Sequence, residues 1–449
     1  MSLGTDEGTA QDEDFRWEKD ALGSAKVRQT ALYGVHTVRA LTAYPLTTLR
    51  LQDLPELVHA YVVVKKACAL TNMSYGLIDE RTAHAIADAA DEILCGKWSD
   101  QFPTPVLQGG GGVSTNMNVN EVLANRAEEL LGGTRGAYQL VHPNDHVNRS
   151  QSTNDTYPTA ISLSSLHLLE QLTVSLQSVV TALKGKAAEY KGVNRLGRTC
   201  LRDAVPLSVE ATHLSQAAAV SRAIARIEAV ASGLLSVPLG ATAVGTSVGA
   251  PQGFGEKAVQ KLAEITGRPL RVSDNYFDAL SNMDPMSDVA HAVSQAASVL
   301  GKIGADLRLL SSGPMGGFNE VTLPAISAGS SIMPGKTNPA IPELVMQVAM
   351  ESLGMAHVVF AATRAGELEL NVMEPVVVNA LHPAIIRLCE TSNVFARSCL
   401  SGLSWNVEVL ERNLAGSLLE KVERSANEGY STVAYGAHNI TASGEVTKS

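Results

Sequence analysis

The sequence predicts a mainly α-helical protein with a long central helical bundle. Apolar residues recur at steps of three and four over several long segments, which is the spacing of one face of an α-helix. Aromatic residues make up only 4% of the 449 residues, and alanine, leucine and valine fill the apolar positions. This composition favours closely packed helices over an aromatic-rich β-sandwich. Long helices that each carry one apolar stripe bury those stripes best when they lie side by side.

The N-terminal part is expected to form a compact helical unit. From Leu54 to Trp98 the apolar residues repeat with helical spacing. Residues 1–14 are acidic and polar, lack the basic start and apolar run of a signal peptide, and are expected to be a disordered tail. In the segment Tyr33–Ala40, His36 and Arg39 are either edges of the packing or side chains directed into a site.

The later helices are expected to form the bundle. Leucine and valine side chains from Leu166 to Leu183 make one continuous stripe on a helix that begins near Pro158. An alanine-rich helix is predicted from Pro206 to about Leu235. The remaining predicted helices are Ser287–Ser311, Ile341–Thr363, Val376–Leu400 and a shorter one near Val407–Arg424.

Four polar segments interrupt the helical pattern and are the candidate functional elements. The first follows four consecutive glycines and Val113, and precedes a predicted helix over Glu121–Leu131. Such a glycine run can present bare backbone N–H groups to an anion near a helix start, although a flexible loop is the alternative. The four segments are Ser114–Asn118, Ser152–Asn154, Thr199–Asp203 and Gly329–Asn338.

The last of these segments has the composition of a carboxylate-binding loop. Two glycines and two prolines lie within Gly329–Pro339, which excludes an ordinary helix. Three hydroxyls, the amine of Lys336 and the carboxamide of Asn338 are crowded into the same loop. Together they supply the charge and the hydrogen-bond donors that hold a carboxylate.

Composition and motifs exclude several other classes of protein. The net charge of −10, without clustered lysine and arginine, argues against nucleic-acid binding. No uncharged apolar segment reaches the roughly 18 residues of a membrane span. Five cysteines without paired or metal-type spacing favour a reducing, cytoplasmic location.

The sequence also argues against a bound cofactor. It contains no P-loop, no dinucleotide-binding fingerprint and no nucleophile elbow. His142 and His146 have the spacing of a zinc pair, but Pro143 and Asn144 between them argue against the helix that such a pair requires. We therefore expect a site for small dicarboxylates that uses neither a metal nor an organic cofactor.

The polar segments resemble, in order, the shared regions of the fumarase/aspartase superfamily. Gly329–Pro339 is similar to its signature loop, and the resemblance extends from about Trp17 to Glu411. Finer motifs resemble those of the aspartate ammonia-lyases; they are Tyr33–Ala40, His142–Asn148, Gln151–Asp155 and Leu370–Pro375.

This resemblance implies a three-domain fumarase/aspartase-like fold. The expected parts are a helical N-terminal domain over residues 1–148, a central helical-bundle domain over 149–404 and a short C-terminal domain over 405–449. It also implies a homotetramer in which three subunits contribute to each active site. The expected partners are therefore a small dicarboxylate or amino-acid substrate and further copies of the chain.

The resemblance further implies an anti-elimination that forms fumarate from L-aspartate. Ser330 would act as the general base, helped by backbone N–H groups and nearby cations because a serine hydroxyl is a weak acid. Proton removal would give an aci-carboxylate intermediate. The resemblance assigns its β-carboxylate to Ser152, Thr153 and Ser331, the α-carboxylate to Lys336, Asn338 and Thr199, and the leaving amine to Asn154.

Two positions depart from the aspartase pattern. Val113 stands where the family has threonine, and Cys200 stands where it has histidine or glutamine. Valine makes no hydrogen bond and cysteine only a weak one. The hypothesis is a less polar leaving-group pocket that suits a substituted amine or another leaving group. The alternatives are a fumarase-type hydration of fumarate to malate and a catalytically inactive structural paralogue.

Overall fold

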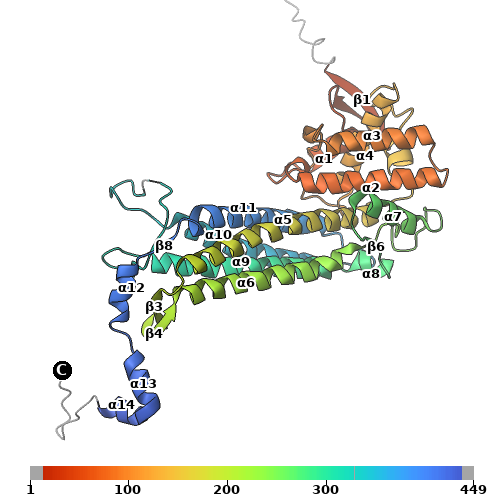
Figure 1. Ribbon diagram of the computed structural model, residues 1–449. Helices are drawn as coiled ribbons and strands as arrows, with labels where there is room; N and C mark the ends of the chain where they lie inside the picture. Colours follow the sequence, from red (N-terminus) through yellow and green to blue (C-terminus); the bar gives the residue numbers. More distant parts are fainter. Residues whose placement is uncertain (1–13, 328, 437–449) are drawn as a thin grey trace, which may run out of the picture. The chain divides into compact units, whose positions relative to one another are not determined.

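The computed structural model describes residues 14–327 and 329–436 (Figure 1). The predicted disordered tail, residues 1–14, lies outside the described residues except for Asp14. Residues 437–449 of the predicted C-terminal domain also lie outside them.

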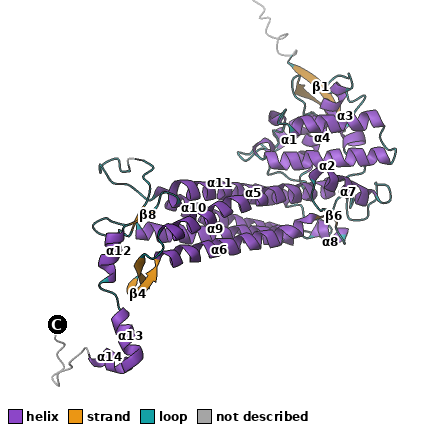
Figure 2. Cartoon of the chain, viewed as in Figure 1, coloured by secondary structure: helices purple, strands orange, loops and turns teal. Residues whose placement is uncertain are grey.

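Helices dominate the described part of the chain, so the prediction of a mainly α-helical protein is confirmed (Figure 2). The strands are short and occur in pairs: β1 (Phe15–Asp20) with β2 (Gly23–Arg28), β3 (Asn194–Thr199) with β4 (Arg202–Ser208), β5 (Ser236–Val237) with β6 (Arg271–Val272), and β7 (Val321–Thr322) with β8 (Ser404–Trp405). The pair β5–β6 is parallel and the other three are antiparallel.

The chain forms two compact units. Unit 1 comprises Met1–Thr173, Ala225–Gln295 and Glu351–Leu388, and unit 2 comprises Val174–Ile224, Ala296–Met350 and Cys389–Ser449. The predicted domain boundaries after residues 148 and 404 stay a proposal. The helices of the first segment of unit 1 are α1 (Val35–Ala43), α2 (Pro55–Ser74), α3 (Glu80–Leu94), α4 (Val113–Leu130) and the start of α5 (Thr153–Glu189). The later helices are α6 (Val209–Ala231), α7 (Phe254–Thr266), α8 (Tyr276–Ser281), α9 (Asp284–Leu310), α10 (Ala340–Thr363), α11 (Glu374–Val394), α12 (Val407–Leu414), α13 (Leu419–Glu428) and α14 (Tyr430–Gly436).

In unit 1, helices α2, α3 and α4 lie side by side (Figure 1). Helix α3 begins where the Asp79 carboxylate accepts the N–H of Thr82 at 3.0 Å, a standard N-terminal cap. Its apolar stripe, which includes Ile86 and Ile93, is buried. The capping residue and the apolar spacing can both be recognised in the sequence. The predicted helical unit over Leu54–Trp98 therefore matches α2 and α3.

Several helix boundaries differ from the predictions. Helix α4 begins at Val113, well before Glu121, and α5 begins at Thr153, before Pro158. Pro206 lies in strand β4, so α6 begins only at Val209. Polar side chains in the first turns of α4 and α5 are hydrogen-bonded to other elements, which a search for apolar periodicity does not detect.

Helix α10 is the one described helix with the length and composition of a membrane span, at a mean hydropathy of 1.5. It contains Glu343 and Glu351, so it is not an uncharged segment. One such helix is weak evidence for a membrane, because helices of a soluble bundle have the same length and composition.

Candidate active site

A cavity of about 510 Å³ in unit 1 gathers the first two predicted polar segments. Its walls come from the starts of α1, α4 and α5, from the turn over residues 142–152 and from the loop over 240–249. Hydroxyl and carboxamide side chains predominate among its lining residues. The cavity is lined by His36, Val113, Asn116, Met117, Asn144, Asn148, Ser150, Gln151, Ser152, Thr153, Thr242, Ala243, Val248 and Gly249.

The glycine run places the start of α4 at the cavity. Gly110, Gly111 and Gly112 all have positive φ, at 76°, 59° and 84°. A Cβ on Gly112 would lie 2.0 Å from the ring of Tyr157, so no other residue fits there. The predicted polar segment Ser114–Asn118 is therefore the first part of α4, and Val113 begins the helix at the cavity wall.

Asn148 connects three elements beneath the cavity. Its Oδ1 accepts hydrogen bonds from Asn116 and Asn120 of α4 at 3.1 and 3.0 Å, and from Lys65 Nζ of α2 at 2.9 Å. Lys65 also donates to Gln151 Oε1 at 3.0 Å. These bonds hold the turn against α2 and α4, and they orient three of the carboxamides that line the cavity.

Lys65 is a fully buried lysine that the sequence analysis did not identify. Burial lowers the pKa of its ammonium group to about 7, while Cys68 and Asp155 act in the opposite direction. Its neighbours Val64, Ala67 and Cys68 are all buried. Lys65 and Lys66 stand between the apolar stretches Val62–Val64 and Ala67–Leu70. Lysine in such a setting is the signal that could have marked Lys65, because a buried charge is costly unless it has a function or partners.

The start of α5 is fixed by Asp155. One carboxylate oxygen accepts the N–H of Ser152 at 3.0 Å, and the other accepts the N–H groups of Gly240 and Thr242 at 3.2 and 2.9 Å. Burial raises the pKa of this carboxyl to about 7, and the three N–H groups oppose that rise. The contacts bring the 240–249 loop to the first turn of α5 and thereby complete the cavity wall.

Four of the predicted substrate-binding residues lie together in this region. Ser152 and Thr153 line the cavity opposite the start of α4, where Val113 also lines it. Asn154 lies next to them, and its amide donates to the carbonyl of Ala243 at 2.7 Å. The structure thus brings Val113, Ser152, Thr153 and Asn154 together within one unit.

The histidines with zinc-like spacing have other roles in the 142–147 turn. His142 Nδ1 accepts the N–H groups of Asn144 and Asp145, both at 3.2 Å. His146 Nδ1 accepts the N–H of His142 at 2.8 Å. Each imidazole therefore uses a ring nitrogen to shape the backbone that carries Asn144 and Asn148.

The signature loop Gly329–Asn338 belongs to unit 2 and is exposed. Gly329 has φ +80°, and a Cβ there would overlap the carbonyl oxygen of Lys336. The Ser330 hydroxyl accepts the N–H groups of Ile332 and Met333 at 3.3 and 3.1 Å. The Lys336 ammonium donates to Asn338 Oδ1 at 2.8 Å. The loop therefore closes on itself and presents Ser330, Ser331, Lys336 and Asn338 on its surface.

The remaining predicted residues lie at the turn of the β3–β4 hairpin in unit 2. Thr199 ends β3 and is paired with Arg202, while Cys200 occupies the turn with φ +51° and is exposed. Arg198 anchors the hairpin through an ion pair with the buried Glu320 at 2.6 Å. Thr199 and Cys200 are thus held by a different element from the signature loop.

Comparison with known proteins identifies the family. A family model described as "Lyase" matches residues 23–354, which is most of the chain. The chain is a member of this lyase family. An aspartate ammonia-lyase from Bacillus sp is 41% identical over 432 residues, covering 96% of this lyase and 92% of the relative. A class II fumarate hydratase from Thermosynechococcus vestitus is 39% identical over 436 residues, covering 97% and 93%.

The solved structures agree with this membership. The lyase superimposes on a fumarate lyase:delta crystallin from Brucella melitensis with a TM-score of 0.92 and 39% identity, over 96% of this chain and 94% of that one. The predicted resemblance to the fumarase/aspartase superfamily is confirmed, and so are its helical fold and a lyase of the aspartate ammonia-lyase type.

Proposed function

We propose that the protein converts L-aspartate, or an aspartate-like acid, into fumarate and ammonia or an amine. The observation that carries the proposal is the lining of the unit 1 cavity. Its described lining residues supply hydroxyls, carboxamides and one imidazole, and none of them is acidic. Such a lining suits an anionic dicarboxylate, whose charge needs donors rather than further carboxylates. The similarity to aspartate ammonia-lyases supports the same substrate.

In the proposed reaction, Ser330 removes a proton from the carbon beside the β-carboxylate. The electron pair moves into that carboxylate to give an aci-carboxylate, and it then forms the carbon–carbon double bond as the carbon–nitrogen bond breaks. The amine leaves with the bonding pair. The N–H groups of Ile332 and Met333 that reach the Ser330 hydroxyl support this role, because such donors stabilise an alkoxide.

The substrate carboxylates are proposed to bind to preorganised groups. The hydrogen bond between Lys336 and Asn338 supports a joint role for these two, with lysine supplying charge and the amide fixing orientation. Preorganised donors of this kind are the largest contribution to many enzymatic rate enhancements. The proposed assignments are Ser152, Thr153 and Ser331 for the β-carboxylate, Lys336, Asn338 and Thr199 for the α-carboxylate, and Asn154 for the amine.

We also propose a cytoplasmic homotetramer whose active sites are shared between subunits. Helix α10 supports association, because large apolar side chains on one of its faces are exposed in the single chain. Exposed apolar faces of this kind mark interfaces between proteins. The exposed residues are Leu344, Met350, Leu353, Val358 and Phe360.

A panel of acids tests the reaction. The purified protein is incubated with L-aspartate, malate and N-substituted aspartates, and fumarate is followed by its ultraviolet absorption. Fumarate from aspartate or its N-substituted forms supports the lyase, whereas fumarate from malate alone would support the rival fumarase-type reaction, which the fumarate hydratase relative favours. Because the side chains of Val113 and Cys200 are less polar than those of the aspartate ammonia-lyases, we expect the N-substituted forms to react faster than aspartate itself.

Replacing the proposed base tests the mechanism. We expect Ser330→Ala to lower kcat by about 10³-fold or more, since removal of a catalytic base or nucleophile has effects of that size. Ser327→Ala, an exposed serine just before the same loop, is the matched control and should keep full activity. Equal, measurable rates for Ser330→Ala and the unmodified protein would exclude this mechanism, whereas no fumarate from either protein would favour the inert paralogue.

A further inference from the structure

His36 is the one titratable side chain among the described residues that line the cavity. It is the second residue of α1, and the neighbouring lining residues Val113 and Asn116 come from the start of α4. The other lining side chains are neutral, and the buried Lys65 contacts two of them from behind. A dicarboxylate in this cavity would therefore meet the imidazole of His36, which can carry a positive charge, on the wall formed by α1.

The backbone of His36 is held by a buried carboxylate. Glu121 of α4 is only 2% exposed, and its Oε1 accepts the N–H of His36 at 2.7 Å. Its Oε2 accepts the N–H groups of Gly34 and Thr37 at 2.9 and 3.1 Å and the Thr37 hydroxyl at 2.7 Å. One carboxylate thus fixes the start of α1 against the helix that supplies the facing wall.

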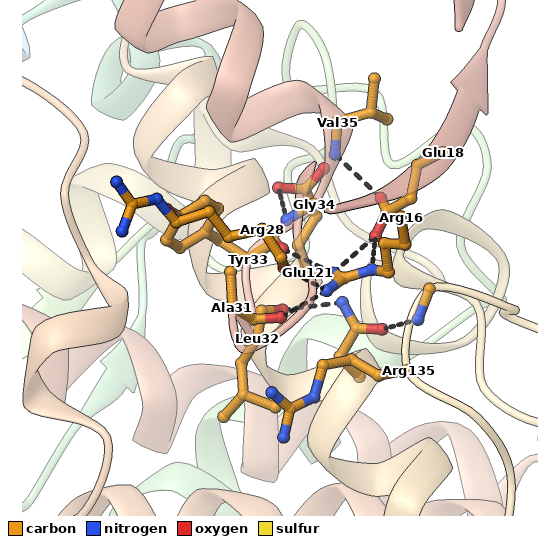
Figure 3. Close-up of polar contacts among 12 residues, drawn as sticks. Arg16, Glu18, Arg28, Ala31, Leu32, Tyr33, Gly34, Val35, Glu121 and Arg135 are labelled. Atoms are coloured by element: carbon orange, nitrogen blue, oxygen red, sulfur yellow. Dashed lines mark hydrogen bonds and ion pairs between the residues drawn. The ribbon is translucent and has the colours of Figure 1, made fainter. Parts of the chain in front are cut away.

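A second carboxylate and an arginine support the same segment from the other side (Figure 3). Glu18 of β1 accepts the N–H of Val35 at 2.9 Å and forms an ion pair with Arg16 at 2.7 Å. Arg16 also donates to the carbonyl groups of Ala31 and Tyr33 at 2.9 and 3.0 Å. The segment that leads into His36 is therefore fixed on both sides.

Gly34 shows how tightly this arrangement is packed. A Cβ at Gly34 would lie 2.4 Å from the Tyr138 hydroxyl and 2.5 Å from Glu18 Oε2. Only glycine lets both carboxylates reach the backbone around His36. These contacts together hold the backbone that carries His36 to the cavity wall.

We infer that His36 binds a carboxylate of the substrate in this cavity and that Glu121 is a positioning residue for it. The inference rests on the proposed function, since it adds a contact for the same class of substrate. A neutral imidazole donates one hydrogen bond to a carboxylate, and a protonated one adds a full charge. Glu121 acts through the backbone of His36 and does not touch the substrate.

This contact makes binding depend on pH in a defined direction. Burial lowers the pKa of His36, Arg39 on the same helix lowers it too, and Asp20 on β1 raises it. Glu121 on α4 contacts the backbone of the same residue. A bound carboxylate favours the protonated imidazole, so affinity for the dicarboxylate rises as pH falls through the pKa of His36.

Succinate, a dicarboxylate that has no amine to lose, is the probe. Its binding to the full-length protein is measured by calorimetry from pH 6 to 8.5 for the unmodified protein, His36→Gln and the control His84→Gln. His84 lies on α3, outside the cavity, with its side chain 55% exposed. We expect His36→Gln to weaken succinate binding by about tenfold at pH 6 and to remove its pH dependence, and to raise KM for L-aspartate more than it lowers kcat.

The positioning role of Glu121 is tested by a double-mutant cycle. Glu121→Gln keeps one accepting oxygen and should weaken succinate binding less than His36→Gln does. In the His36→Gln background it should add no further loss, which a general loss of structure would not produce. Circular dichroism and thermal unfolding confirm that each variant is folded.

A measurement on the unmodified protein keeps the test valid if a variant does not fold. Calorimetry in buffers of different ionisation enthalpy counts the protons taken up with succinate, and we expect uptake at pH values above the pKa that His36 has without succinate. No uptake, or a His36→Gln variant with unchanged affinity and pH dependence, overturns the inference while fumarate production leaves the proposed function intact. A protein that neither binds succinate nor releases fumarate refutes both.

Discussion

Val113 and Cys200 are the residues that we propose set the polarity around the leaving group. Val113 begins α4 and lines the cavity beside Asn116, so it offers methyl groups where the neighbouring wall offers amides. Cys200 lies at the β3–β4 turn with φ +51°, in the left-handed region. Histidine is among the residues that tolerate this conformation better than most, so the position can accept a stronger hydrogen-bonding side chain.

Restoring the two polar side chains tests their effect on the substrate. We expect Val113→Thr combined with Cys200→His to raise the turnover of L-aspartate, because each added donor in such a site can contribute about 10²-fold or more. Initial rates of fumarate release are compared with those of the two single variants. The idea of an altered pocket is wrong if the double variant is no faster, or if the unmodified protein already matches ordinary aspartate ammonia-lyases.

At the scale of elements, the pair Glu92 and Arg126 joins α3 to α4. The guanidinium donates to both carboxylate oxygens, at 2.6 and 3.0 Å, and Trp98 donates to one of them at 2.9 Å. Arg126 lowers the pKa of Glu92 to about 2. Because α4 supplies Val113 and Asn116 to the cavity, this pair also helps to hold the cavity wall.

The Glu92–Arg126 pair gives a pH-dependent contribution to stability. The pKa of Glu92 is lower in the folded protein than the ordinary value of 4.5, so the contribution is present above pH 4.5 and is lost as pH falls towards 2. We expect Glu92→Gln to lower the free energy of unfolding at pH 7 by about 1 kcal/mol, since solvent screens a pair that is one-fifth exposed.

Urea denaturation of both proteins at pH 7 and pH 3 measures the difference. It should shrink at pH 3, where the glutamate of the unfolded chain is protonated. A difference that is equal at the two pH values would show that the ion pair is not its cause.

At the scale of the whole molecule, the exposed face of α10 is the feature that a single chain leaves unexplained. Met350 is 65% exposed and Leu353 is 46% exposed on a helix whose other face is buried. Contact with further copies of the chain would remove these side chains from water. The proposed sharing of active sites between subunits would then depend on this face.

Placing a charge on this face tests the assembly. We expect Met350→Asp to shift the protein from the proposed tetramer to smaller species and to reduce fumarate production, because a buried unpaired carboxylate opposes association. Light scattering after size exclusion measures the mass, and Gln260→Asp, at an exposed polar position of α7, is the matched control. A tetramer that keeps its mass with Met350→Asp would place the interface elsewhere.

Sharing of active sites predicts that two inactive variants complement each other. Ser330→Ala and Ser152→Ala would be inactive alone, but mixed tetramers would contain sites that take Ser330 from one subunit and Ser152 from another, each from a subunit in which that serine is intact. Random mixing of equal amounts should restore about a quarter of the native activity, since half of the subunits carry each intact serine. The two proteins are unfolded and refolded together, and no recovery would favour sites built from a single chain.

Much of the fold follows from local sequence alone. The apolar stripes of α5, α9 and α10 predict long helices because each residue's neighbours at steps of three and four are close along the chain. Glycines and prolines in Gly329–Pro339 likewise determine a loop whatever surrounds it. The polar groups of that loop could also be predicted from local sequence, because Lys336 and Asn338 are two residues apart and contact each other directly.

Tertiary structure alone decided which distant polar groups meet. The sequence left His36 open between packing and a site, and it gave no expectation for Lys65. The folded chain puts His36 on the cavity wall through Glu121, and it gives Lys65 the carboxamides of Asn148 and Gln151. Local periodicity reports only which side of a helix is buried, whereas hydrogen bonds between residues some 85 positions apart depend on how the whole chain packs.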